Sequence, residues 1–307
     1  MVERLVANEK VVGSSPIARS MKRKSIMIIW IASYPKSGNT YIRSFLASYF
    51  FSEKGIFDFD LLLKLHQFPN MKFSKMKAET MEEASKNWIY NQRQFFDKKK
   101  LNLVKTHNCL LKYKGNKFTT KNETLGAIYI VRDPRNLITS FTNHYSYNYD
   151  QALKFMLDED SASVEKTVDN DHSNFTFLNS WSNHYKSWKN NLEFETMFIK
   201  YEDLENNKIE IFSKIVIFIN RLLQNNDKLV ENKLLNSIKS TNFSNMKNKE
   251  LNEGFEESVI SKKTGKKLNF FNLGFNNRYQ KILENDFKKK MNLNFQNDLK
   301  ELGYSYD

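Results

Sequence analysis

Three short stretches of the sequence combine cations, hydroxyls and an imidazole in patterns suited to anion chemistry. The first, Tyr34–Thr40 (YPKSGNT), lies between an apolar run and a helical pattern. A strand, a tight glycine turn and a helix N-terminus form a cradle for an anion, because backbone N–H groups and the helix dipole both point at the ligand. Lys36 adds a cation to this cradle and Thr40 adds a hydroxyl. The stretch therefore predicts a phosphate site.

The second stretch, Lys105–His107, ends another apolar run. Histidine is the side chain best suited to accept a proton near neutral pH. A histidine after a strand is also commonly a structural residue, so its interpretation depends on its neighbours. If it shares a sheet edge with Lys36, His107 becomes a candidate general base.

The third stretch, Arg132–Arg135, is followed by Ser140 in a helical pattern. The guanidinium of Arg132 can bind a phosphate through two hydrogen bonds. Pro134 suits the entry of a helix, and Ser140 on the first turns of that helix can face the same phosphate. The alternative is an Arg–Asp pair at the surface beside a helix-starting proline.

The elements that position these residues are predicted from hydrophobic periodicity. Short apolar runs with β-branched residues predict buried strands, at Ser25–Ser33, Leu101–Thr106, Ala127–Arg132 and Thr196–Tyr201. Helical patterns separate and follow them, at Thr40–Phe51, Met81–Phe96, Asn136–Tyr147, Phe175–Asn190, Lys208–Leu223, Asp227–Lys239 and Glu284–Glu301.

Strands that alternate with helices predict a three-layer α/β fold, in which a mostly parallel central sheet is flanked by helices. In such sheets ligands bind beyond the carboxyl ends of the strands, so a fold of the P-loop nucleotide-binding type is expected. Phe57–Lys77 has no clear periodicity. Phe243–Phe275 is rich in Lys, Asn and Gly and is predicted to be a long ordered or closing loop.

Composition narrows the class of protein. The 307 residues are 40% hydrophobic, which is enough for a full core, and the net charge of +13 indicates anionic partners. Cys109 is the single cysteine, so an intrachain disulfide and a C-x-x-C site are excluded and a reducing, cytoplasmic location is expected. No apolar run reaches the roughly 18 residues of a membrane span.

The N-terminal segment differs from the rest of the chain. Met1–Ser20 lacks the Lys, Asn, Phe and Ile bias of the remainder, and VVGSSPIARS resembles a translated transfer-RNA gene. We therefore expect residues 1–24 to be a non-native or disordered extension, with the native start at Met21 or Met27. Residues 25–307 are then expected to form a single domain.

Taken together, the three stretches resemble the family of sulfotransferases that use 3′-phosphoadenylyl sulfate (PAPS). YPKSGNT resembles the 5′-phosphosulfate loop of that family, IVRDPRNLITS its 3′-phosphate motif, and KTH its catalytic-histidine segment. Tyr201–Leu204 and Ser240–Met246 are similar to two further family segments. The order and spacing agree from Ile28 to Phe275.

The resemblance implies roles for individual residues. Lys36 would contact the bridging oxygen and the leaving 5′-phosphate, Lys105 would touch the sulfuryl group, and His107 would be the general base. The resemblance also implies a set of donor-binding residues: Lys36, Ser37, Gly38, Asn39 and Thr40 at the 5′-phosphate, Arg132 and Ser140 at the 3′-phosphate, Tyr41, Tyr201, Thr241 and Phe243 at the adenine, and Gly274. It implies no metal, in keeping with the lack of metal-binding motifs in the sequence.

One segment departs from the family pattern. Phe271–Gly274 (FNLG) stands where the family usually has Arg-Lys-Gly, so two cations of the 3′-phosphate site are missing. Their loss implies weaker donor affinity or a relaxed preference for the 3′-phosphate. Candidates to compensate are Lys266, Lys267 and Arg278.

The four other histidines are interpreted as structural or surface residues, namely His66, His144, His172 and His184. His144 follows the arginine stretch by about three helical turns and could border an acceptor pocket, as could nearby tyrosines. A structural or surface role is preferred for all four, because nothing in their spacing indicates chemistry.

Three alternative functions remain open. A P-loop nucleotide kinase or NTPase is disfavoured because no G-x-x-x-x-G-K-[ST] string occurs. A nucleic-acid binder lacks a reading motif. An inactive sulfotransferase-like nucleotide-binding protein is suggested by the lost Arg-Lys pair. For an active enzyme, the expected acceptor is a small molecule or glycan with a hydroxyl or amine, and no nucleic-acid partner is expected.

Overall fold

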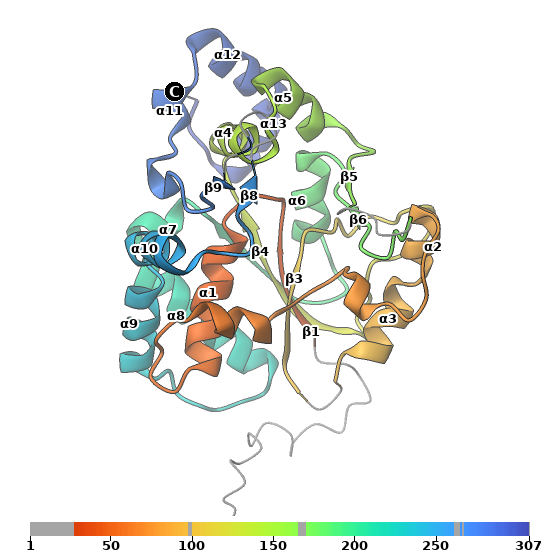
Figure 1. Ribbon diagram of the computed structural model, residues 1–307, viewed down its shortest axis with the longest axis vertical. Helices are drawn as coiled ribbons and strands as arrows, with labels where there is room; N and C mark the ends of the chain where they lie inside the picture. The colour runs from red at the N-terminus through yellow and green to blue at the C-terminus, as the bar shows by residue number, and fades with distance from the viewer. Residues whose placement is uncertain (1–27, 98–99, 165–169, 261–264, 266, 307) are drawn as a thin grey trace, which may run out of the picture.

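The computed structural model describes residues 28–97, 100–164, 170–260, 265 and 267–306 (Figure 1). Its centre is a five-stranded sheet with the order β2-β3-β1-β4-β7, in which all neighbouring strands are parallel. The strands are β1 Ile28–Ser33, β2 His66–Gln67, β3 Asn102–Thr106, β4 Thr124–Val131 and β7 Thr196–Lys200. The predicted α/β class is confirmed. The expected extension, residues 1–24, lies outside the described residues.

The first strand shows why the sheet is covered on both faces. All six of its residues are buried. Ile28, Trp30 and Ala32 pack into one hydrophobic core, whereas Ile29 and Ile31 pack into another. Because successive side chains of a strand point to opposite faces, this continuous apolar run requires helices on both sides.

Two groups of helices supply those covers, as Figure 1 shows. The core that contains Trp30 is completed by α2 Met81–Lys86, α3 Trp88–Phe95, α4 Pro134–Tyr145, α5 Tyr149–Leu157, α6 Trp181–Lys189, α12 Asn285–Asn294 and α13 Gln296–Leu302. The opposite core is completed by α1 Asn39–Phe51, α7 Asp203–Asn206, α8 Lys208–Leu222, α9 Glu231–Ser240 and α10 Phe243–Glu253.

Shorter elements complete the described chain. They are helix α11 Tyr279–Ile282, 3₁₀ helices at Phe59–Lys64, Met71–Phe73 and Gly274–Asn276, the antiparallel pair β5 Ala162–Ser163 with β6 Thr176–Phe177, and the antiparallel pair β8 Val259–Ile260 with β9 Lys267–Leu268. Among the described helices, none combines the length and apolar character that a membrane crossing demands.

Two predicted helices are interrupted. The pattern Met81–Phe96 forms α2 and α3, with Asn87 as the junction. The pattern Glu284–Glu301 likewise forms α12 and α13, with Phe295 between them. In both cases the helical pattern of apolar residues continues across the break. The sequence pattern therefore does not indicate that the helix axis changes direction there.

The predicted helix Phe175–Asn190 is wrong in its first residues. Thr176–Phe177 pairs with β5 as a strand, and α6 begins only after Ser180. The hydroxyl of Ser180 accepts a hydrogen bond from the backbone N–H of Asn183, which is a typical helix N-cap. The cap therefore sets the start of the helix later than the apolar pattern suggests.

The predicted long loop Phe243–Phe275 is also corrected. Its first third is helix α10, which begins after Asn242, whose side chain accepts a hydrogen bond from the N–H of Asn245. The helix ends at Gly254, which has a φ of 80°. Low apolar content hid this helix, because it buries only Met246 and Glu250. Of the described residues that follow, 256–258 and 268–275 line a cavity at the carboxyl edge of the sheet.

Candidate functional site

The carboxyl edge of the sheet contains a cavity of about 460 Å³. It is lined by nearly all of the predicted site residues, namely Lys36, Gly38, Asn39, Thr40, Tyr41, Lys105, His107, Arg132, Ser140, Tyr201, Thr241, Phe243 and Gly274. Ser37 lies behind this wall and is fully buried, and its hydroxyl has no partner among the described residues. Residues from β1, β3, β4 and β7 thus meet at one place, as parallel strands require.

The loop after β1 adopts a backbone that opens towards the cavity. Lys36 has a φ of 67° and Gly38 has a φ of 98°, both in the left-handed region. Gly38 is the N-cap of α1 and offers no side chain to its first N–H groups. A Cβ at Gly38 would lie 2.3 Å from a ring carbon of Tyr201, so glycine is required there. The exposed N–H groups and the helix dipole favour an anion.

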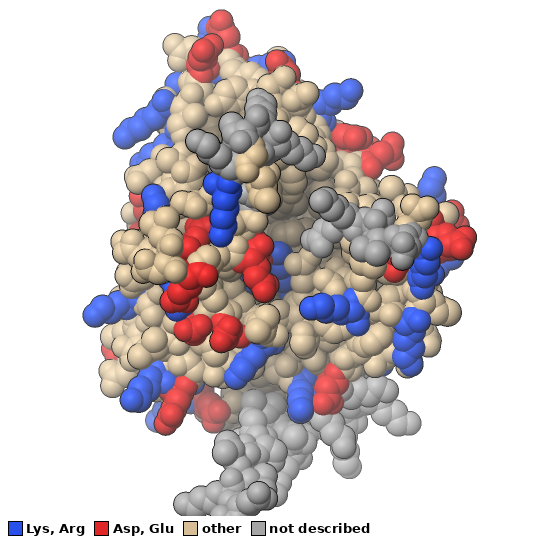
Figure 2. All heavy atoms as spheres, viewed as in Figure 1, with Lys and Arg blue, Asp and Glu red and all other residues tan. Residues whose placement is uncertain are grey.

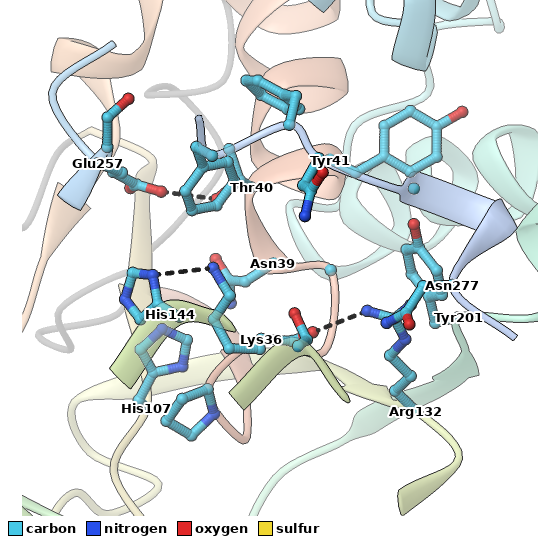
Figure 3. Close-up of a pocket in the computed structure, with 18 of the residues that line it drawn as sticks. Lys36, Asn39, Thr40, Tyr41, His107, Arg132, His144, Tyr201, Glu257 and Asn277 are labelled. Carbon is cyan, nitrogen blue, oxygen red and sulfur yellow. Dashed lines mark hydrogen bonds between the residues drawn. The ribbon is translucent and has the colours of Figure 1, made fainter. Parts of the chain in front are cut away.

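The ammonium of Lys36 lies in the middle of this site (Figure 3). Its Nζ is 3.4 Å from Nδ1 of His144 and 4.1 Å from the ring centroid of Phe270. Burial lowers the pKa of Lys36 to about 8, and the nearby charges of Lys105 and Arg132 act in the same direction. An anion placed here would restore the ordinary pKa, so the site favours a negatively charged ligand.

His107 is held in one orientation at the end of β3. Its Nδ1 is 2.7 Å from the backbone oxygen of Ser33 and 3.3 Å from the hydroxyl of the same residue. A carbonyl oxygen can only accept, so Nδ1 carries the proton and the neutral ring keeps Nε2 free as an acceptor. Burial, followed by the charge of Lys105, holds the pKa of His107 well below its usual value. The imidazole is therefore neutral and can accept a proton.

His184 forms a hydrogen bond with the backbone of His107. Its Nε2 donates to the backbone oxygen of His107 at 2.9 Å, and its Nδ1 lies 2.8 Å from the hydroxyl of Tyr129. Burial lowers the pKa of His184 to about 4. The expected structural role of this histidine agrees with these contacts.

Arg132 contacts both the loop that contains Lys36 and the ring of Tyr201. Its guanidinium donates to the backbone oxygen of Lys36 at 3.2 Å and lies 4.5 Å from the ring centroid of Tyr201. Ser140 faces the same cavity from α4. The lysine loop and the arginine stretch, which lie about a hundred residues apart in the sequence, are therefore adjacent, as binding of a single nucleotide requires.

Aromatic rings form the far end of the cavity. Phe275 stacks on Tyr201 with ring centroids 5.0 Å apart and an interplanar angle of 23°, and Tyr41 meets Phe275 edge-on at 6.3 Å. Phe243 lies against Gly274, where a Cβ would come within 2.6 Å of the ring. Sequence reasoning missed Phe275, although its place directly after the retained Gly274 was an available signal.

Of the three cations expected to compensate at the 3′-phosphate site, the two that the structure describes do not line this cavity. Lys266 lies outside the described residues, and Lys267 is exposed on β9. Arg278 pairs with Glu205 at 2.6 Å and lines a neighbouring cavity of about 250 Å³. Within the described cavity lining, the cations are those of Lys36, Lys105 and Arg132.

Sequence reasoning preferred a structural interpretation for His144 and missed Glu257 and Arg43. His144 lines the cavity, and its pKa is lowered to about 4 by burial and then by the charge of Lys36. Glu257 accepts a hydrogen bond from the hydroxyl of Thr40 at 2.8 Å and forms an ion pair with Arg43. Arg43 and Glu257 are far apart in the sequence, so no local pattern indicates the pair.

The arrangement supports one kind of chemistry. Cations and a helix N-terminus can bind and polarise a multiply charged anion, the aromatic end can bind a base, and the imidazole can remove a proton beside them. The described residues contain no cluster of three or more His, Cys, Asp or Glu side chains that could hold a metal ion.

Comparison with known proteins gives consistent findings. A family model described as "Sulfotransferase domain" matches residues 28–303. A flavonol 3-sulfotransferase from Flaveria bidentis is 24% identical over 196 residues, which cover 62% of this chain and 56% of that protein. The match thus spans little more than half the length of that relative.

One solved structure shows the same fold, and a second gives a weaker match. A crystal structure of retinol dehydratase in a complex with retinol and PAP has a TM-score of 0.54 at 16% identity, and the match covers 92% of this chain and 84% of that chain. A mouse sulfotransferase complexed with PAP has a TM-score of 0.46 at 19% identity, over 90% of this chain and 82% of that chain.

Proposed function

Because the chain belongs to the sulfotransferase-domain family, we propose that it moves a sulfuryl group from PAPS to a hydroxyl or amine of an acceptor. One observation carries this proposal. The cation of Arg132 lies 3.2 Å from the backbone of the Lys36 loop, on a single cavity that also contains His107. A donor with phosphates at both ends of an adenosine needs such a pair of anion sites beside a base.

The residues present fit this donor. The hydroxyl of Ser37 is buried without a partner among the described residues, and the carboxylate of Glu257 contacts Thr40 where a phosphate oxygen would be expected. The loop from Ser37 to Thr40 would hold the 5′-phosphate, whereas Arg132 and Ser140 would hold the 3′-phosphate. The rings at the far end would hold the adenine, a set that includes Tyr41, Tyr201 and Phe243 together with Phe275. When bound, the donor supplies the sulfuryl group and an adenosine bisphosphate leaving group.

The residues of the chain then account for a one-step displacement at sulfur. Nε2 of His107 accepts the proton of the acceptor as its oxygen or nitrogen forms a bond to sulfur. The bond between sulfur and the 5′-phosphate oxygen breaks in the same step. Lys36, Lys105 and the N-terminus of α1 stabilise the negative charge that develops on that oxygen.

One part of the cavity lining is mixed in character. Polar residues on it come from β2, α4, β5 and β6, namely Gln67, His144, Ser163 and Thr176, and they are accompanied by Leu178 and Phe270. This composition supports a small-molecule or glycan acceptor that presents several polar groups.

Two sequence expectations complete the proposal. The thiol of Cys109 is fully buried, which suits a reducing compartment such as the cytoplasm. We also propose that residues 25–307 act as one domain, since both hydrophobic cores share the single central sheet.

Ligand-dependent melting tests the donor assignment. At a hundred times its dissociation constant, adenosine 3′,5′-bisphosphate (PAP) should add about 2.7 kcal/mol of stability. ATP with Mg²⁺ should add little, whereas the opposite preference would indicate a kinase or NTPase. Transfer from labelled PAPS to a panel of phenols, sugars and amines then tests the reaction. Binding of PAP without transfer to any acceptor class would favour the inactive homologue.

A further inference from the structure

An acidic side chain lies among the cations of the donor cradle. Glu257 belongs to the irregular segment between α10 and β8, and its carboxylate accepts a hydrogen bond from the Thr40 hydroxyl at 2.8 Å (Figure 3). The same carboxylate is 3.2 Å from Nζ of Lys105 and forms an ion pair with Arg43. A single carboxylate thus interacts with three donor groups, which belong to side chains of α1 and β3.

Those donors form a subsite that requires an anion. Thr40 and Arg43 lie one turn apart on α1, and a guanidinium nitrogen of Arg43 is also 3.3 Å from the Thr40 hydroxyl. Arg43 is only 4% exposed. A buried guanidinium beside a second cation and a helix N-terminus is unfavourable unless negative charge is present. The subsite is therefore built for an anion, whichever group supplies it.

We propose that Thr40, Arg43 and Lys105 form an anion subsite of the donor site, in which Glu257 is a resident anion that a phosphate or sulfonate of the donor replaces. This inference rests on the proposed function, because the incoming anion is the 5′-phosphosulfate group of PAPS. It makes Arg43 a further donor-binding residue and makes Glu257 a competitor of the donor.

The carboxylate is the replaceable member of the cluster. The side chain of Glu257 is 26% exposed, whereas that of Arg43 is 5% exposed and that of Lys105 is 10% exposed. The cations are fixed on a helix and a central strand, but Glu257 approaches from an irregular segment that also lines the cavity. A phosphosulfate carries more charge and more acceptor oxygens than a carboxylate, so it can satisfy the same donors.

The exchange is driven by a ligand and not by pH. Burial acts to raise the pKa of the Glu257 carboxyl, but the charges of Arg43 and Lys105 outweigh it and hold the pKa well below its usual range. The carboxylate therefore stays charged at the pH at which proteins work, and only a competing anion removes it. The donor can bind only molecules in which the subsite is open. The apparent dissociation constant of the donor therefore equals the intrinsic constant divided by the open fraction.

Substitution of Glu257 tests this competition. Isothermal titration of PAP and of inorganic pyrophosphate into Glu257→Gln and Glu257→Ala should give dissociation constants about 10-fold or more below wild type, as expected if the open fraction is a tenth or less. Glu253→Gln is the matched control, because it removes the same charge four residues away at an exposed side chain that pairs with Lys249 and does not line the cavity. It should change either constant by less than about 2-fold. Arg43→Gln in the Glu257→Gln background should weaken both ligands again.

Each result has a distinct meaning. Equal pyrophosphate and PAP affinities in wild type and both Glu257 variants would overturn the resident anion, while the proposed function would stand. Tighter pyrophosphate binding without any PAP binding would sustain the subsite and reject PAPS as the donor. A structure of the PAP complex should show the Glu257 carboxylate away from the Thr40 hydroxyl. Persistence of that hydrogen bond beside bound PAP would also overturn the inference.

Discussion

At the scale of single residues, one hydrogen bond decides which nitrogen of His107 can react. The backbone oxygen of Ser33 is 2.7 Å from Nδ1, so the proton is held there and Nε2 is left as the nitrogen that can act as the proposed base. Orientation and basicity are thus separable properties of this side chain. An asparagine can keep the hydrogen bond to Ser33 but cannot accept a proton.

We predict that His107→Asn and His107→Ala both lower turnover by about 10²-fold or more, the scale of a lost general base. PAP affinity should remain within about 2-fold of wild type, since the role proposed for His107 is at the acceptor and not at the nucleotide. Turnover is measured with labelled PAPS and the best acceptor from the screen, and affinity by titration. Retention of a tenth of wild-type turnover by the asparagine variant would remove His107 from proton transfer.

Lys36 gives a prediction about pH. Burial, with the charges of Lys105 and Arg132, lowers the pKa of its ammonium to about 8. Above this pH the free site loses the cation that is proposed to contact the 5′-phosphate. The dissociation constant of PAP should therefore rise by about 10-fold one unit above that pKa, because about one-tenth of Lys36 then remains protonated. Lys36→Arg, which keeps its charge, should bind PAP with little change over the same pH range.

The lowered pKa of Lys36 also predicts how the stability of the protein changes with pH. Between pH 8 and 10.5 the folded chain binds fewer protons at Lys36 than the unfolded chain does. Stability therefore rises with pH in this window as the cost of burying the charged lysine disappears. The difference in free energy of unfolding between wild type and Lys36→Met should show this slope. A slope of the opposite sign would mean that Lys36 is stabilised, not destabilised, by its surroundings.

At the scale of elements, the N-terminus of α1 depends on a single glycine. Gly38 combines a φ of 98° with close contact to the Tyr201 ring, so an alanine must move either the loop or the ring. We predict that Gly38→Ala raises the dissociation constant of PAP by about 10-fold or more, because the aligned N–H groups are lost. The far-ultraviolet circular dichroism should remain close to wild type.

Gly303→Ala is the matched control for that variant. Gly303 has a φ of 67° at the end of α13, and an added Cβ there would meet nothing within 4 Å. It imposes comparable backbone strain far from the cavity, so it should cost about 1 kcal/mol of stability and leave PAP binding unchanged. Equal effects of the two alanines on PAP binding would contradict a special role for the α1 turn.

The elements also show what could be predicted from the sequence. The four long strands were predicted because each is a local apolar run, and the stretches Tyr34–Thr40 and Arg132–Arg135 were predicted because their chemistry is contiguous. Helix α10 was missed because its face is mostly polar. Contacts such as Thr40 with Glu257 join residues 217 positions apart, and no local pattern encodes them.

At the scale of the whole molecule, the net charge of the chain differs in character from the local charge beside the cavity. The chain carries a net charge of +13, yet Figure 2 shows acidic and basic side chains interspersed over one face, with acidic groups beside its central hollow. Glu256 and Glu257 line the cavity together with the three cations. The long-range field therefore attracts an anionic donor, while contacts within the site decide how firmly it is held.

This division predicts how salt acts on binding. Raising the ionic strength from about 0.05 M to about 0.5 M shortens the screening length several-fold, so the association rate of PAP should fall by about 10-fold. The dissociation rate should change much less, since buried contacts are weakly screened. Adenosine, which lacks phosphates, is the matched control and should associate at a rate that salt leaves unchanged. Stopped-flow competition against a fluorescent PAP analogue measures both rates. A salt effect confined to dissociation would show that the overall positive charge does not guide the donor, and that the cavity cations act only after contact.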